Sequence, residues 1–144
     1  MRRLGLLLLL LPMVVALLAG EGTAVAQPAA DGKVIVVYVS AYNCPYCREW
    51  EAFAQPKFEK SAERKQVEFR MVKASYFSRV DEDRYWAEDI RWIRDQLKIT
   101  RGTPRFIVAK DGKVLIHKFG TSSWDRDVFP LVRRLVSQKE GSSR

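Results

Sequence analysis

The sequence predicts an α/β layer fold with a mixed central sheet of about four strands. A continuous apolar, β-branched run at 33–39 is typical of a strand buried on both faces. A helical pattern and a second strand-like run follow it, which implies a parallel pair of strands. Asp111-Gly112 joins two further strand-like runs and therefore predicts an antiparallel hairpin near the C-terminus.

The N-terminus has the features of a secretory signal peptide. Two arginines precede a leucine-rich stretch, and an A-x-A cleavage motif occupies residues 24–26. An uncleaved membrane anchor is the alternative, but residues 4–19 fall short of the roughly 20 apolar residues of a spanning helix, and Pro12 interrupts them. We expect residues 1–26 to be removed during export to the periplasm, with no stable membrane insertion afterwards.

The rest of the chain is about the size of one ordinary small domain. We expect a flexible lead-in at 27–32, one domain at 33–138 and a frayed tail at 139–144. The chain contains 25 Lys and Arg against 17 Asp and Glu, a net charge of +8. Because the basic residues are scattered among acids, and an exported protein seldom meets nucleic acid, we expect a solvated surface and no nucleic-acid partner.

The middle of the chain predicts two helical regions around a strand. From Cys44 to about Lys65 the pattern is helical, with a break expected at Pro56, and residues 66–74 alternate like a strand. The clearest helix is expected at 81–98. Its apolar residues have the i, i+4, i+7, i+11 spacing of one buried face, and they are Trp86, Ile90, Ile93 and Leu97.

The C-terminal part predicts the hairpin and a last helix. Residues 103–109 and 113–119 are the strand-like runs on either side of the Asp-Gly turn. Helical spacing resumes after Gly120, and Pro130 fits the first turn of a helix that starts near Asp127. The element order is therefore strand, helix, strand, helix, strand, strand, helix.

The chain contains two cysteines, Cys44 and Cys47. In an exported protein they are expected to pair, but closing so short a loop would stabilise the fold very little. A structural zinc site needs four ligands, and His117, the one histidine of the chain, is interpreted as a surface residue without a function. We expect no metal site of that kind, although binding of Cu(I) between the two thiolates stays open.

The position of the pair favours redox chemistry. Cys44 lies where a buried strand leads into a helix, and Pro45 fits the first helical position. The main-chain amides of Tyr46 and Cys47, together with the positive end of the helix, would favour the thiolate of Cys44. Cys44 is therefore the expected nucleophile and Cys47 the resolving thiol. Arg48 would lower the thiol pKa slightly, or it is an ordinary exposed arginine.

These features resemble the thioredoxin-like family, with a glutaredoxin-type CPYC centre, over roughly residues 33–138. The stretch RGTPRFIVAKDGKVLIHKFG at 101–120 is similar to the family's cis-proline strand and hairpin. The resemblance implies that Pro104 is cis and lies against the redox pair. It also implies that Thr103 offers its backbone to an extended client peptide, and that no cofactor beyond the Cys44–Cys47 disulfide is needed.

The sequence also departs from the family pattern. Tyr38 stands where many thioredoxins carry a buried acid, so proton transfer to or from Cys47 would depend on water or another group. Asn43 and Ala41 replace residues typical of thioredoxins and glutaredoxins, and Gly120 to Asp125 only loosely resembles a glutathione loop. The segment 75–98 is longer and more aromatic than expected, either to shape client choice or to enlarge the core.

The resemblance implies a periplasmic thiol-disulfide oxidoreductase that exchanges disulfides with client proteins, acting more as a reductase or isomerase than as an oxidant. A reductant in an oxidising compartment would need an upstream electron donor in the membrane, and we expect a monomer. The alternative from another class is a metallochaperone that holds Cu(I) between Cys44 and Cys47. A second alternative is an interaction module whose cysteine pair has no redox role.

Overall fold

The computed structural model of the chain describes residues 32–98 and 102–142. The expected signal peptide at 1–26, the lead-in up to residue 31 and residues 143–144 of the tail lie outside these residues. Residues 139–142, which were expected to be frayed, belong instead to the last helix of the chain. Among the described residues there is no helix whose length and apolar character would let it cross a bilayer.

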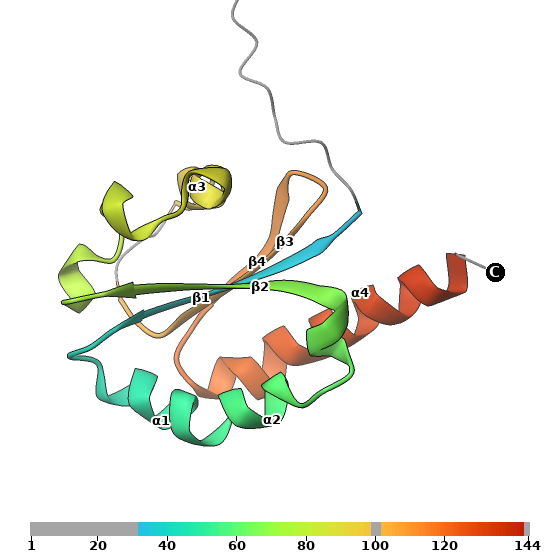
Figure 1. Cartoon of the computed structure of the whole chain (residues 1–144), viewed down its shortest axis with the longest axis horizontal. Helices are drawn as coiled ribbons and strands as arrows, with labels where there is room; N and C mark the ends of the chain where they lie inside the picture. Colours follow the sequence, from blue (N-terminus) through green and yellow to red (C-terminus); the bar gives the residue numbers. More distant parts are fainter. Residues whose placement is uncertain (1–31, 99–101, 143–144) are drawn as a thin grey trace, which may run out of the picture.

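The fold is built on a four-stranded mixed sheet in the order β2-β1-β3-β4 (Figure 1). Strand β1 is parallel to β2, and it is antiparallel to β3, which in turn is antiparallel to β4. This confirms the predicted sheet of one parallel pair and one C-terminal hairpin. The strand bounds are β1 Val34–Ala41, β2 Val67–Ala74, β3 Arg105–Lys110 and β4 Lys113–Phe119.

The hairpin turn has the backbone that its sequence predicts. Asp111 has φ 51° and Gly112 has φ 72°, so both central residues lie in the left-handed region. Two-residue turns of this kind match the twist of antiparallel strands, and Asp-Gly tolerates them better than most pairs.

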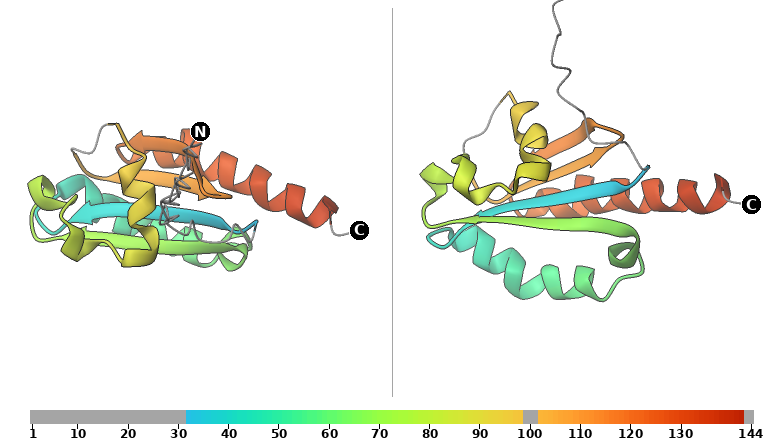
Figure 2. Two further views of the ribbon diagram at one scale, coloured as in Figure 1. Left: turned by 90° about the horizontal axis from the view of Figure 1, so that it is seen from above. Right: turned by 45° about the horizontal axis from the view of Figure 1, so that its top comes forward.

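Helices α1 (Pro45–Phe53), α2 (Gln55–Glu59) and α4 (Phe129–Ser142) lie on one face of the sheet, which we call the helix face (Figures 1 and 2). The expected break occurs at Ala54, two residues before Pro56. A short 3-10 turn, η1 (Glu63–Gln66), leads into β2. The core beneath the helices is aromatic, and its buried rings are Tyr38, Trp50, Phe58, Phe106 and Trp124.

The other face is covered by residues 75–98, which we call the cover segment (Figure 1). The prediction of one helix over 81–98 was wrong. The segment contains three 3-10 turns and one short helix, namely η2 (Phe77–Arg79), η3 (Asp83–Tyr85), η4 (Glu88–Ile90) and α3 (Arg91–Asp95). The backbone is extended at Glu82 and Trp86, which interrupts the helix there. Trp86, Ile90 and Ile93 are nevertheless buried, as their spacing predicted.

The last helical region begins at residue 122, five residues before the expected start. Its first part is a π-helical turn, η5 (Trp124–Val128), in which the Phe129 N–H donates to the Trp124 carbonyl. Pro130 has no N–H and so cannot continue the ordinary i to i−4 ladder, which accounts for an irregular turn at this point.

Candidate active site

The cysteine pair lies where β1 ends and α1 begins. The Cys44 N–H donates to the Ala41 carbonyl at 3.1 Å, which closes the turn after the strand. Cys44 then caps α1, with Pro45 in the first turn. Cys44 and Cys47 form a disulfide with a Cα–Cα distance of 5.2 Å. The expected strand-to-helix position is confirmed.

The two sulfurs have different surroundings. The Cys47 N–H donates to the sulfur of Cys44 at 3.1 Å. Cys44 is 4% exposed at the start of the helix, whereas Cys47 is fully buried. When the disulfide is reduced, the same N–H and the positive helix end favour a thiolate on Cys44. Cys44 is thus the sulfur that an incoming group can reach first.

Arg48 is directed at the loop before the disulfide. Its Nη1 donates to the Tyr42 carbonyl at 3.2 Å, and its side chain is exposed. The guanidinium therefore fixes the turn between β1 and α1. The charge of Arg48 lies near the cysteine pair, but the hydrogen bond to the sulfur of Cys44 comes from a neutral main-chain donor, the Cys47 N–H.

Thr103 and Pro104 lie at the same end of the two central strands, β1 and β3, as the disulfide. Arg105, the first residue of β3, pairs with Val39 two residues before the end of β1. The Thr103–Pro104 bond is cis, the isomer that the resemblance implies. Pro104 is buried and Thr103 half-buried, and the Pro104 carbonyl accepts the Gly120 N–H at 3.0 Å.

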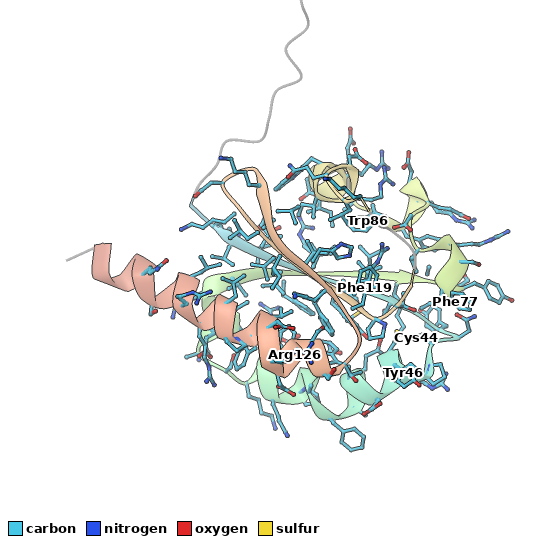
Figure 3. All side chains as sticks on the ribbon, turned by 180° about the vertical axis from the view of Figure 1, so that it is seen from behind. Cys44, Tyr46, Phe77, Trp86, Phe119 and Arg126 are labelled. Carbon is cyan, nitrogen blue, oxygen red and sulfur yellow. A yellow bond between two sulfur atoms is a disulfide. The ribbon has the colours of Figure 1, made fainter. Side chains whose placement is uncertain are left out.

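Four exposed aromatic side chains occur in the active-site turn or in the part of the cover segment that is bonded to it, and they were not predicted. Their exposed fractions are 53% to 67%, and they are Tyr42, Tyr46, Tyr76 and Phe77. The Phe77 N–H donates to Oδ1 of Asn43 at 3.0 Å, which ties the cover segment to the loop before Cys44. Figure 3 shows Phe77, Cys44 and Tyr46 at the same end of the molecule. Beside Phe77, a pocket of about 410 Å³ is lined by Ser78, Asp81 and Gly102.

An ion pair between a fully buried arginine and a partly exposed aspartate lies at this end of the sheet, on the side of the cover segment. Arg105 has no exposed side-chain surface and donates through Nη2 to Oδ1 of Asp81 at 2.5 Å. Burial lowers the pKa of Arg105, and the bond to Asp81 opposes that shift. No sequence pattern connects these two residues, because 24 positions separate them along the chain.

His117 belongs to the same cluster, so its interpretation as a surface residue was wrong. It pairs with Ile107 and is half-buried, with its ring 4.6 Å from that of Phe119. Burial first, and the charge of Arg105 second, lower the pKa of His117 to about 4. It therefore stays neutral at physiological pH.

A second polar cluster lies on the buried side of Cys47. The Tyr38 hydroxyl lies 3.2 Å from the Cys47 carbonyl oxygen and 3.3 Å from Oε1 of Glu51. Lys73 donates to Oε2 of Glu51 at 2.7 Å. Burial first, and then the charge of Glu51, raise the pKa of Tyr38. The sequence indicated the unusual tyrosine, but not the acid and the lysine beside it.

In the described part of the chain, no three His, Cys, Asp or Glu side chains cluster closely enough to hold a metal ion.

The geometry of the chain defines the class of fold to which it belongs. The sheet order, the CXXC disulfide at the start of α1 and the cis bond before β3 are those of a thioredoxin-like fold. No protein-family model matches the chain, and no curated protein matches it.

Several solved thioredoxins are similar in structure. The periplasmic thioredoxin SoxS from Paracoccus pantotrophus is 17% identical, with 74% of this chain and 99% of that chain covered and a TM-score of 0.46. The thioredoxin of Malassezia sympodialis is 22% identical, with 78% of each chain covered and a TM-score of 0.47. The thioredoxin of Fasciola hepatica is 23% identical, with 69% and 81% covered and a TM-score of 0.45.

Proposed function

We propose that this chain is an exported thiol-disulfide oxidoreductase that exchanges disulfides with client proteins through Cys44 and Cys47. The observation that supports it most is the placement of the pair at the start of α1, where the sulfur of Cys44 accepts the Cys47 N–H. A thiolate is stabilised in that position, and thiolates are the attacking species in disulfide exchange.

The exchange has two balanced steps. The Cys44 thiolate attacks a client disulfide, forms a mixed disulfide and releases one client thiolate. Cys47 then loses its proton and attacks the sulfur of Cys44, which restores the Cys44–Cys47 disulfide and releases the second client thiolate. Two electrons pass to the client, and the reverse sequence oxidises it.

The client would bind across the end of the sheet at which Thr103 and Pro104 lie. Thr103 is half-buried and directly precedes β3, so its main chain is available to an extended segment beside the disulfide. The side chains of Tyr46 and Phe77 are exposed at this end of the sheet. Exposed aromatic surface of this kind is what apolar client residues contact. Pro45 and Tyr46, which the structure places in the first turn of α1, would form the surface over which the client cysteine approaches.

The favoured direction is reduction or isomerisation. A neutral main-chain donor stabilises the thiolate of Cys44 less than a charged donor would, and a less stabilised thiolate makes the reduced form a better reductant. A reductant of this kind would act in the periplasm as a monomer and would receive its electrons from a donor in the membrane.

The test is a trapping experiment with Cys47→Ser, because the mixed disulfide on Cys44 then has no resolving thiol. We expect a covalent client adduct that disappears with reductant and can be identified by mass. Cys44→Ser is the matched control and should trap nothing. Absence of adducts and of any disulfide turnover, together with stoichiometric retention of Cu(I), would favour the metallochaperone instead.

A further inference from the structure

Cys47 is sealed from solvent, yet the proposed exchange requires it to lose and regain a proton. Its exposed fraction is zero, and it belongs to the first turn of α1. A buried thiol needs a neighbouring group that can take the proton and pass it on, because water does not reach the sulfur.

Glu51 is placed to do this. It follows Cys47 by four residues on α1, and so lies on the same face one turn further along. Its side chain is 21% exposed, so it connects the buried face of the helix to solvent. The Tyr38 hydroxyl lies within hydrogen-bonding distance of both the Cys47 carbonyl and Glu51, which fixes the carboxylate next to the turn that carries the thiol.

The surroundings of Glu51 keep the carboxylate in place. Lys73, on β2, donates to its second oxygen at 2.7 Å and lies 4.9 Å above the Tyr42 ring. The raised pKa of Tyr38 keeps that hydroxyl protonated, so it positions Glu51 and does not carry the proton itself.

The other charged groups near α1 lie at the surface. Arg48 and Glu49 are exposed, and Asp125 of η5 lines a small surface pocket with Glu49. From β3 and η5, the rings that pack on α1 are those of Phe106 and Trp124, which carry no charge.

We infer that Glu51, paired with Lys73 and oriented by Tyr38, is the proton acceptor and donor for Cys47, an inference that rests on the proposed disulfide exchange. In the reducing direction, the Glu51 carboxylate takes the proton from the Cys47 thiol, and the Cys47 thiolate attacks Cys44. The protonated Glu51 then releases the proton to solvent. When the disulfide is reduced again, the same proton path runs in reverse.

The experiment compares Glu51→Gln with Glu49→Gln in the reduced full chain. Glu49 is an exposed acid on the same helix, so the two variants change the charge equally. A peptide disulfide is added, and acid-quenched samples are analysed by mass for the mixed disulfide and for its resolution. Glu51→Gln should slow resolution about tenfold near pH 7, while the first attack by Cys44 stays within about twofold. Glu49→Gln should leave both steps unchanged.

The pH profile separates proton transfer from a structural role. At a pH above the thiol pKa no proton acceptor is needed, so the resolution rate of Glu51→Gln should reach that of the wild type. Glu51→Asp keeps the carboxylate and should be intermediate at neutral pH. A purely electrostatic role predicts the opposite sign, because removing a negative charge near Cys47 lowers its thiol pKa and speeds resolution.

Unchanged or faster resolution in Glu51→Gln, with normal turnover by the wild type, would overturn this inference and leave the exchange reaction standing. Failure of the wild type to form any mixed disulfide would instead overturn the proposed function. Should Glu51→Gln fold poorly, the same comparison is made with Glu51→Asp, and equal rates to the wild type at every pH would again overturn the inference.

Discussion

The two faces of the sheet are packed by different means. On the helix face the contacts are aromatic: the Trp50 ring lies 4.2 Å from Tyr38 and 5.1 Å from Trp124. On the opposite face the cover segment buries apolar side chains such as Trp86 and Ile93, and polar groups add to this packing. Arg105 pairs with Asp81 although it is fully buried, and Arg94 donates to the Asp81 carbonyl at 3.0 Å.

The difference follows from main-chain hydrogen bonding. Regular helices satisfy their own interior amides and carbonyls, so α1 and α4 need only present apolar side chains to the sheet. The short 3-10 turns of the cover segment leave carbonyls without helical partners. Side chains bind them instead: Arg91 donates to the Trp86 carbonyl at 3.2 Å, and the Trp86 indole donates to the Val80 carbonyl at 2.7 Å.

The strongest test of this contrast is Arg105→Met. Removing the fully buried arginine leaves the Asp81 carboxylate, which is 30% exposed, without its cation, so we expect a loss of about 2–3 kcal/mol in the free energy of unfolding, measured in urea. The double variant with Asp81→Asn should recover part of that loss. Arg84→Met, which removes an exposed pair with Glu82, is the control and should cost less than about 0.5 kcal/mol. A loss below that of the control would show that the cover segment does not depend on the pair.

A more local test is Arg94→Met. It removes the donor to the Asp81 carbonyl and should destabilise the cover segment by about 1–2 kcal/mol. Hydrogen exchange should quicken for amides at 81–97 and stay unchanged in β1 and α1. Arg126→Met, at an exposed arginine of the helix face, should change neither. Equal quickening on both faces would contradict a separately held cover segment.

The smallest expected effect concerns pH. His117 has a folded-state pKa of about 4, below the unfolded value near 6.5. The unfolded chain therefore binds more protons between these values, and stability falls as pH decreases from 6.5 to 4. Because His117 is only half-buried, we expect its share to be roughly 1 kcal/mol. His117→Leu should remove that share from the pH dependence of urea unfolding, and an unchanged slope would contradict the assignment.

Local sequence patterns were sufficient to predict those elements whose stabilising interactions join neighbouring residues. Pro45 and the CPYC spacing identified the start of α1, and Asp111-Gly112 identified the hairpin, because each is a property of a few neighbouring residues. The spacing of Trp86, Ile90 and Ile93 correctly predicted which residues are buried. It did not predict their backbone, because side chains of the same segment, among them those of Arg91 and Arg94, bind carbonyls that a regular helix would have satisfied.

The sequence by itself determined the mixed sheet and the position of Cys44 and Cys47, since turn preferences and hydrophobic patterning specify them. The cis bond before β3 was implied only by the resemblance to a known family. The tertiary structure decided which polar groups meet. Lys73 reaches Glu51 only because β2 pairs beside β1, and Arg105 reaches Asp81 only because the cover segment folds over β3. Such contacts join residues that are more than twenty positions apart, and their energies depend on a burial that appears only when the whole sheet is covered.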